Sequence, residues 1–65
     1  MPVTNRNDIS VGQEVEVVLK KDQSTGTLTR GHVARILTKK YIHTRGIKVE
    51  LVEDGMVGRV QNIIR

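Results

Sequence analysis

The side chains that could perform chemistry in this chain are mostly those of lysine, arginine and glutamine, near the ends of its apolar segments. Lysine and arginine bind phosphate oxygens, glutamine hydrogen-bonds sugars and bases, and an aromatic ring stacks on a base. If the fold brings these segment ends together, they form a cationic rim around one ring. Such a rim predicts nucleic-acid binding that weakens steeply with salt. The candidate binding residues are Lys20, Lys21, Gln23, Arg30, Lys39, Lys40, Tyr41, Arg45, Arg59 and Gln61.

Catalytic chemistry is not indicated by the remaining polar residues. Neither Ser10 nor Ser24 lies in a Gly-x-Ser-x-Gly elbow, so no serine nucleophile is evident. Glu14 and Glu16 have the spacing that places two carboxylates on one strand face, where an acid and a base could cooperate. The same spacing is typical of an ordinary solvated strand face. We therefore expect a protein that is not an enzyme.

Metal and nucleotide cofactors are also not expected. His32 and His43 are not a closely spaced pair, and the chain has no cysteine to complete a zinc site with them. The loop at residues 22–26 holds one glycine, lacks Gly-Lys-Ser/Thr and does not lead into a predicted helix. A phosphate-cradling loop needs those features.

Length and composition limit the kinds of protein this chain can form. A chain of 65 residues and 7.3 kDa is one small domain, too small for a large enclosed active site. Its only aromatic residue is Tyr41, so the core must be aliphatic. The net charge of +4 and pI near 10 favour a polyanionic partner. The lack of cysteine, of a 20-residue apolar span and of a signal peptide predicts a cytoplasmic protein with no membrane partner.

Apolar residues at two-residue spacing predict short strands separated by polar turns. The second strand breaks strict alternation and has Gly31 near its start, which indicates a bulge or a sharp bend. Asp54 and Gly55 predict a tight hairpin, and Gly58 indicates a bulge or a close backbone approach. Residues 61–64 fit either another short strand or one helical turn. The strands are expected at residues 14–20, 28–38, 47–51 and 56–60.

Four or five short strands in so small a domain must close on themselves to cover their apolar face. The expected fold is all-β, a small SH3-like barrel of the KOW or Tudor-like kind, with an OB-fold as the alternative. Residues 9–65 would form this barrel, and residues 1–8 a flexible N-terminal arm. Ile9 and Val11 would fold back over the first apolar face. The expected core is Val15, Val17, Leu19, Val33, Ile36, Val49, Leu51, Val57, Val60 and Ile63.

Two motifs of the chain resemble those of a known family. Residues 20–26 have the order Lys-x-Asp-Gln-x-Thr-Gly, and residues 57–61 read Val-Gly-Arg-Val-Gln. Their order and separation are similar to the YwbE-like family of small uncharacterised prokaryotic proteins, over residues 9–63. The resemblance implies a free-standing cytoplasmic protein and transfers no biochemical activity to this chain.

Two classes of function remain open at the level of sequence. The first is a monomeric RNA-binding module, acting alone or in a ribonucleoprotein through its basic loops. The second is a protein-binding adaptor that docks a partner by strand addition or surface complementarity. Few apolar side chains are left for an adaptor surface, namely Ile42, Val52, Met56 and Ile64.

Overall fold

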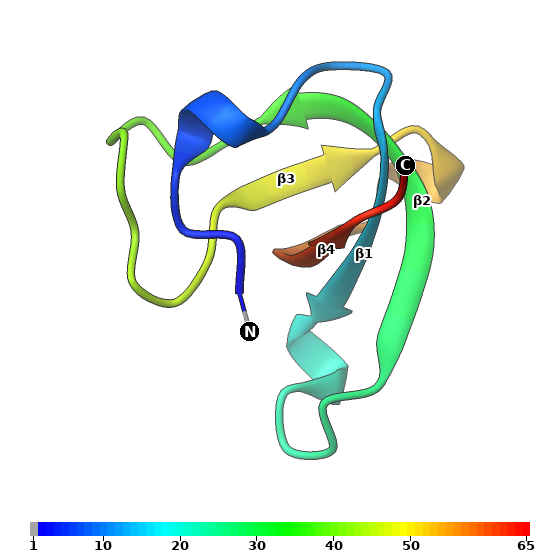
Figure 1. The fold of residues 1–65 in the computed structure, drawn as a ribbon. Helices are drawn as coiled ribbons and strands as arrows, with labels where there is room; N and C mark the ends of the chain where they lie inside the picture. Colours follow the sequence, from blue (N-terminus) through cyan, green and yellow to red (C-terminus); the bar gives the residue numbers. More distant parts are fainter. Residues whose placement is uncertain (1) are drawn as a thin grey trace.

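The computed structural model, which describes residues 2–65, is a closed antiparallel barrel of four strands (Figure 1). Each strand pairs with two neighbours, and the last strand returns to the first. No α-helix occurs within these residues. The fold is therefore the predicted all-β, SH3-like barrel, and the OB-fold alternative is not what the chain forms. The strands are β1 (Glu14–Leu19), β2 (Leu28–Ile36), β3 (Lys48–Leu51) and β4 (Val57–Ile63). The 3₁₀ turn η1 (Arg6–Asp8) precedes β1, and the turns η2 (Lys20–Asp22) and η3 (Glu53–Gly55) lie between strands.

The core follows the two-residue alternation of the strands. In β1 and β3 every second residue is buried, as predicted, and the barrel interior is wholly aliphatic. Val57 was wrongly predicted to be in the core. It lies three positions from Val60 on a regular stretch of β4, so the two side chains must face opposite sides of the sheet. The buried residues are Ile9, Val15, Val17, Leu19, Val33, Ile47, Val49, Leu51 and Val60, with Ile36 and Ile63 packed at the margin.

Two bulges explain why the apolar pattern of β2 and β4 is irregular. Ala34 is the extra residue of β2, because Val33 pairs with Leu51 while Arg35 already pairs with Glu50. Gln61 is the extra residue of β4, opposite the step from Glu16 to Val17 in β1. Each bulge reverses the alternation that follows it. The bulge expected in the second strand is confirmed, and residues 61–63 continue β4 rather than forming a helical turn.

Gly58 and the Asp-Gly turn set the geometry of β4. A Cβ on Gly58 would lie 2.8 Å from Val17 Cγ2 and 2.8 Å from the Val18 carbonyl oxygen, so the predicted close backbone approach is confirmed. Asp54 and Gly55 have φ of 57° and 63°, the left-handed values that the tight turn between β3 and β4 requires.

The N-terminal segment differs from the loose arm that was predicted. Val3 donates its amide to the Val60 carbonyl oxygen and accepts a bond from the Ile47 amide, each at 2.9 Å, so it links the residue before β3 to the middle of β4. Asn5 forms a bridge with Ile42, and Ile9 is buried, whereas Val11 is exposed and does not cover the core. The arm is held because these backbone groups find partners on the barrel. Position 1 of the predicted arm lies outside the described residues.

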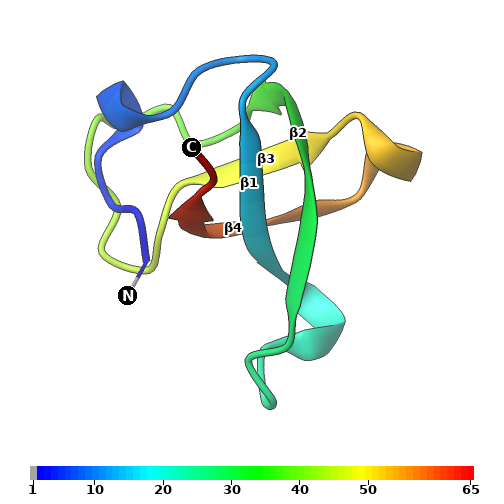
Figure 2. The ribbon, with the colours of Figure 1, turned by 45° about the vertical axis from the view of Figure 1, so that its right-hand side comes forward.

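The helical segments within residues 2–65 are short 3₁₀ turns of three residues each. Over residues 2–65, none has the length and apolar character needed to cross a membrane. Figure 2 shows η2 and the loop after it projecting beyond the paired part of β1 and β2, at the end of the barrel away from η1.

Candidate functional site

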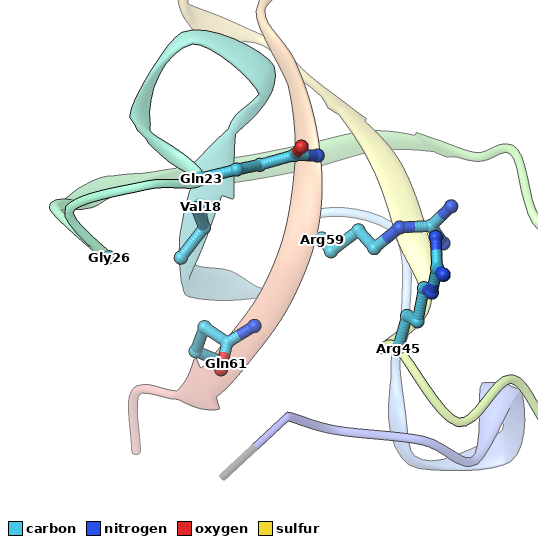
Figure 3. Close-up of a pocket in the computed structure, with 6 residues that line it drawn as sticks. All are labelled: Val18, Gln23, Gly26, Arg45, Arg59 and Gln61. Carbon is cyan, nitrogen blue, oxygen red and sulfur yellow. The ribbon is translucent and has the colours of Figure 1, made fainter.

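A shallow groove runs over the outer face of β4, between η2 on one side and the start of β3 on the other. It consists of two hollows of about 400 and about 310 Å³, which meet at Gln23 and Arg59. We call it the β4 groove. Figure 3 shows the larger hollow, with its side chains contributed by β1, β4 and the two loops beside them. The β4 groove is lined by Val18, Lys20, Gln23, Gly26, Arg45, Lys48, Val57, Gly58, Arg59 and Gln61.

Arg59 is central to this groove because of the strand register. It pairs with Val18 of β1 on one side and with Lys48 of β3 on the other. Paired residues of neighbouring strands lie about 5 Å apart and point to the same face. Arg59 and Lys48 therefore place two like charges side by side on the outer face of the sheet.

Arg59 is also fixed in position. Its Nη1 donates a hydrogen bond of 2.9 Å to the Gly46 carbonyl oxygen, and the side chain is partly buried. Arg45 precedes that glycine, and Figure 3 shows its guanidinium pointing towards that of Arg59. Two guanidinium groups that converge without a carboxylate between them form a ready site for an anion such as phosphate.

The acidic residues of the chain lie elsewhere, mostly in ion pairs of their own. Over residues 2–65, no carboxylate lines the β4 groove, and no ion pair involves Lys20, Arg45, Lys48 or Arg59. In contrast, Arg35 binds Glu50 at 2.7 Å. The groove therefore concentrates positive charge that the protein does not neutralise itself.

Two amide side chains also line the β4 groove. Gln23 follows η2, and Gln61 is the bulged residue of β4. Figure 3 shows the Gln23 side chain reaching across β4 from the η2 side and Gln61 on that same side of the strand, whereas Arg59 extends to the other side towards Arg45. Neither side chain has a hydrogen-bond partner among residues 2–65, so both amides are free to bind a ligand.

The structure brings together half of the residues predicted to form the site. The gathered residues come from η2 and its loop, from the segment before β3 and from β4, and they are Lys20, Gln23, Arg45, Arg59 and Gln61. The residues that do not line the groove are Lys21, Arg30, Lys39, Lys40 and Tyr41. Sequence reasoning missed Lys48, although its position between the inward residues Ile47 and Val49 already marks it as facing outward.

Arg30 lies outside the groove because its register pairs it with carboxylates. Arg30 in β2 stands opposite Glu16 of β1. Its guanidinium lies 3.5 Å from the Glu16 carboxylate and 3.9 Å from the Glu14 carboxylate. Asn62 also donates to Glu16, at 3.0 Å. The paired glutamates thus form a neutralised outer surface of β1 and β2, in keeping with the solvated face considered from the sequence.

Tyr41 and its basic neighbours lie on the loop between β2 and β3, beside the N-terminal segment. The Tyr41 carbonyl oxygen accepts the amide of Arg6 at 2.7 Å, while its side chain is 67% exposed. The ring therefore does not complete the cationic rim that was expected around it. Only Arg45, at the far end of the same loop, reaches the groove.

His32 and Glu53 form a separate polar contact that ties the turn η3 to β2. The Glu53 carboxylate accepts the His32 backbone amide at 2.8 Å and contacts Nδ1 at 2.7 Å. The backbone hydrogen bond, followed by the imidazole contact, lowers the pKa of Glu53 to about 2. The hydrogen bond to Glu53 raises the pKa of His32 above its ordinary value of 6.5. Over residues 2–65, no three metal-ligating side chains cluster, here or elsewhere.

Comparison with known proteins places the chain among small proteins of its own length. Residues 2–63 match the family described as "Uncharacterized conserved protein (DUF2196)". The chain is 59% identical over 59 residues to "Uncharacterized protein YwbE" of Bacillus subtilis (strain 168), which covers 91% of this chain and 89% of that protein. No solved structure matches. On the strength of these two matches, the chain belongs to the YwbE-like family that its loop and strand motifs resemble.

Proposed function

We propose that this protein is an RNA-binding module that holds its ligand in the β4 groove and acts by binding rather than by catalysis. The observation that carries the proposal is the set of four cations around the groove. None of them has an ion-pair partner within residues 2–65, and no carboxylate lines the groove. Phosphate groups of a nucleic acid neutralise such a set and release counterions as they bind.

The alternative function, a protein adaptor, has less support in the fold. Each of the four strands is paired on both sides, so a partner strand finds no free edge in the barrel. Ile42 and Val52 are exposed, but they lie on separate loops, and Met56 packs against the core. An adaptor function would need a surface contact that these scattered side chains do not outline.

Titration with labelled RNA tests the proposal directly. The affinity of a fluorescently labelled RNA is measured by anisotropy between about 50 and 200 mM salt, where each phosphate contact contributes a slope of roughly 0.7 to 0.9 in log affinity against log salt. We expect Arg59→Gln to weaken binding and to reduce the slope by about that amount.

Arg65→Gln is the matched control for this charge change. Arg65 follows Ile64, whose amide bonds the Glu14 carbonyl at the start of β1. Gln61 is the groove residue nearest to Arg65 along the chain, four residues or roughly 13 Å before it, and Arg65 itself lines neither hollow. The control should bind RNA like the unmodified protein. Absence of binding at the lowest salt, or equal losses in the two variants, would overturn the proposal.

An NMR titration of the labelled protein then maps the surface. We expect shifts for residues 20–26, 45–48 and 57–61. Shifts concentrated at residues 39–42 instead would place the ligand on the loop that carries Tyr41 and would remove the β4 groove from the function.

A further inference from the structure

The β4 groove offers no aromatic ring to its ligand. Tyr41, on the loop between β2 and β3, does not line either hollow, and neither do the imidazole rings of His32 and His43. Proteins that bind single strands without sequence preference depend on aromatic side chains, on which successive bases stack. The apolar residues that line this groove are valines and glycines, so an unpaired base finds no aromatic platform there.

The groups that the groove does offer match the outside of a double helix. Its cations suit phosphate oxygens, and the Gln23 and Gln61 amides each carry donors and an acceptor without a partner in residues 2–65. A ribose 2′-hydroxyl is itself both donor and acceptor. In duplex RNA the 2′-hydroxyls and phosphates line a wide, shallow minor groove, where proteins reach both.

We infer that the β4 groove binds the backbone of double-helical RNA, with its cations on phosphates and Gln23 and Gln61 on 2′-hydroxyls. This inference rests on the proposed RNA-binding function and names the form of RNA. Figure 3 shows the arrangement that supports it, with the two amides towards the η2 side of β4 and the Arg59 and Arg45 guanidinium groups together on the other side. Recognition of this kind reads the shape of the RNA and the sugar, and little of the base sequence.

The test compares three ligands of one sequence by anisotropy: an RNA duplex, the corresponding DNA duplex and one RNA strand that forms no hairpin. We expect the RNA duplex to bind about tenfold more tightly than either of the others, the scale of one or two hydrogen bonds. The double variant Gln23→Ala/Gln61→Ala should lose the preference for RNA over DNA while keeping its salt slope.

Asn7→Ala is the matched control, because it removes an exposed amide outside the groove whose side chain has no hydrogen-bond partner within residues 2–65. Gln23→Ala alone, in a loop rather than at the bulge, covers the case in which the double variant does not fold. Equal affinity for the duplex and the single strand would overturn the inference, as would equal losses on RNA and DNA in the glutamine variants. Failure of all three ligands to bind would overturn the proposed function itself.

Discussion

Arg59 stands opposite another cation, an arrangement that is unfavourable for the protein alone. Its partner in the register is Lys48, and Figure 3 shows the guanidinium of Arg45, which lies on the loop before β3, pointing towards that of Arg59. Like charges directly opposite each other on a sheet are destabilising by some tenths of a kcal/mol. A phosphate group bound between them, as proposed, would replace this repulsion with two attractive contacts.

The His32 and Glu53 pair makes the stability of the protein depend on pH. His32 has a raised pKa, so its contribution is complete below 6.5 and is lost as the pH rises through the higher folded value. Glu53 has a pKa lowered from 4.5 to about 2, so its contribution is complete above 4.5 and is lost as the pH falls towards 2. Both contributions are therefore complete only between pH 4.5 and 6.5.

Glu53→Gln should accordingly lower the thermal midpoint most within that window and less on either side of it. Thermal unfolding of both proteins at an acidic, a weakly acidic and an alkaline pH measures the difference. Asp54→Asn is the control, because Asp54 lies in the same turn, forms no ion pair within residues 2–65 and has a φ that asparagine tolerates. A pH-independent difference would contradict the assigned pairing.

At the level of the strands, the closeness of β1 and β4 depends on Gly58. A methyl group there would lie 2.8 Å from Val17 Cγ2 and from the Val18 carbonyl oxygen, so the strands must separate to accept it. Gly58→Ala should lower the free energy of unfolding by about 1–3 kcal/mol, the usual cost of overpacking. Urea denaturation measures this change.

A double-mutant cycle with Val17→Ala separates the side-chain contact of that methyl group from its other contacts. The smaller side chain removes Val17 Cγ2 but leaves Val17 Cβ and the Val18 carbonyl oxygen, so the two substitutions should be less harmful together than their sum. Unchanged stability of Gly58→Ala would show that β1 and β4 lie farther apart than the structure has them.

The strands themselves could be predicted from the sequence because alternation is a local property. Val15 and Val17, or Val49 and Leu51, face inward wherever their strand is placed. The register between strands is not local, and it determines that Arg30 meets Glu16 while Arg59 meets Lys48. Which side chains line the groove could therefore be determined only from the strand pairing in the structure.

The bulges were harder still to predict than the register. An extra residue at position 61 reverses the alternation of β4, which places Ile63 against the core and leaves the Gln61 amide at the groove. Nothing in the residue types near Gln61 distinguishes this from a regular strand. The sequence also marked Tyr41 as part of the site because of its neighbours, whereas the path of its loop carries it to the N-terminal segment.

For the molecule as a whole, the N-terminal segment should contribute to stability although it lies outside the barrel strands. Deleting residues 2–5 removes the two hydrogen bonds of Val3 and the bond from His43 to Thr4. At about 1 kcal/mol for each bond, the loss is roughly 2–3 kcal/mol, or on the order of 10 °C in Tm for a domain of this size. Differential scanning calorimetry measures it. An unchanged Tm would mean that the segment is the loose arm suggested by its composition.

Closure of the barrel also determines when the protein can fold during its synthesis. β1 obtains its second neighbouring strand only from β4, and this pairing joins residues near position 17 to residues near position 60. A domain this small folds in one cooperative step, and long-range pairings of this kind form late. While a ribosome is still producing residues before Val57, β1 therefore lacks its β4 partner and the barrel cannot close. β1, β2 and β3 therefore fold stably only after β4 has emerged from the ribosome.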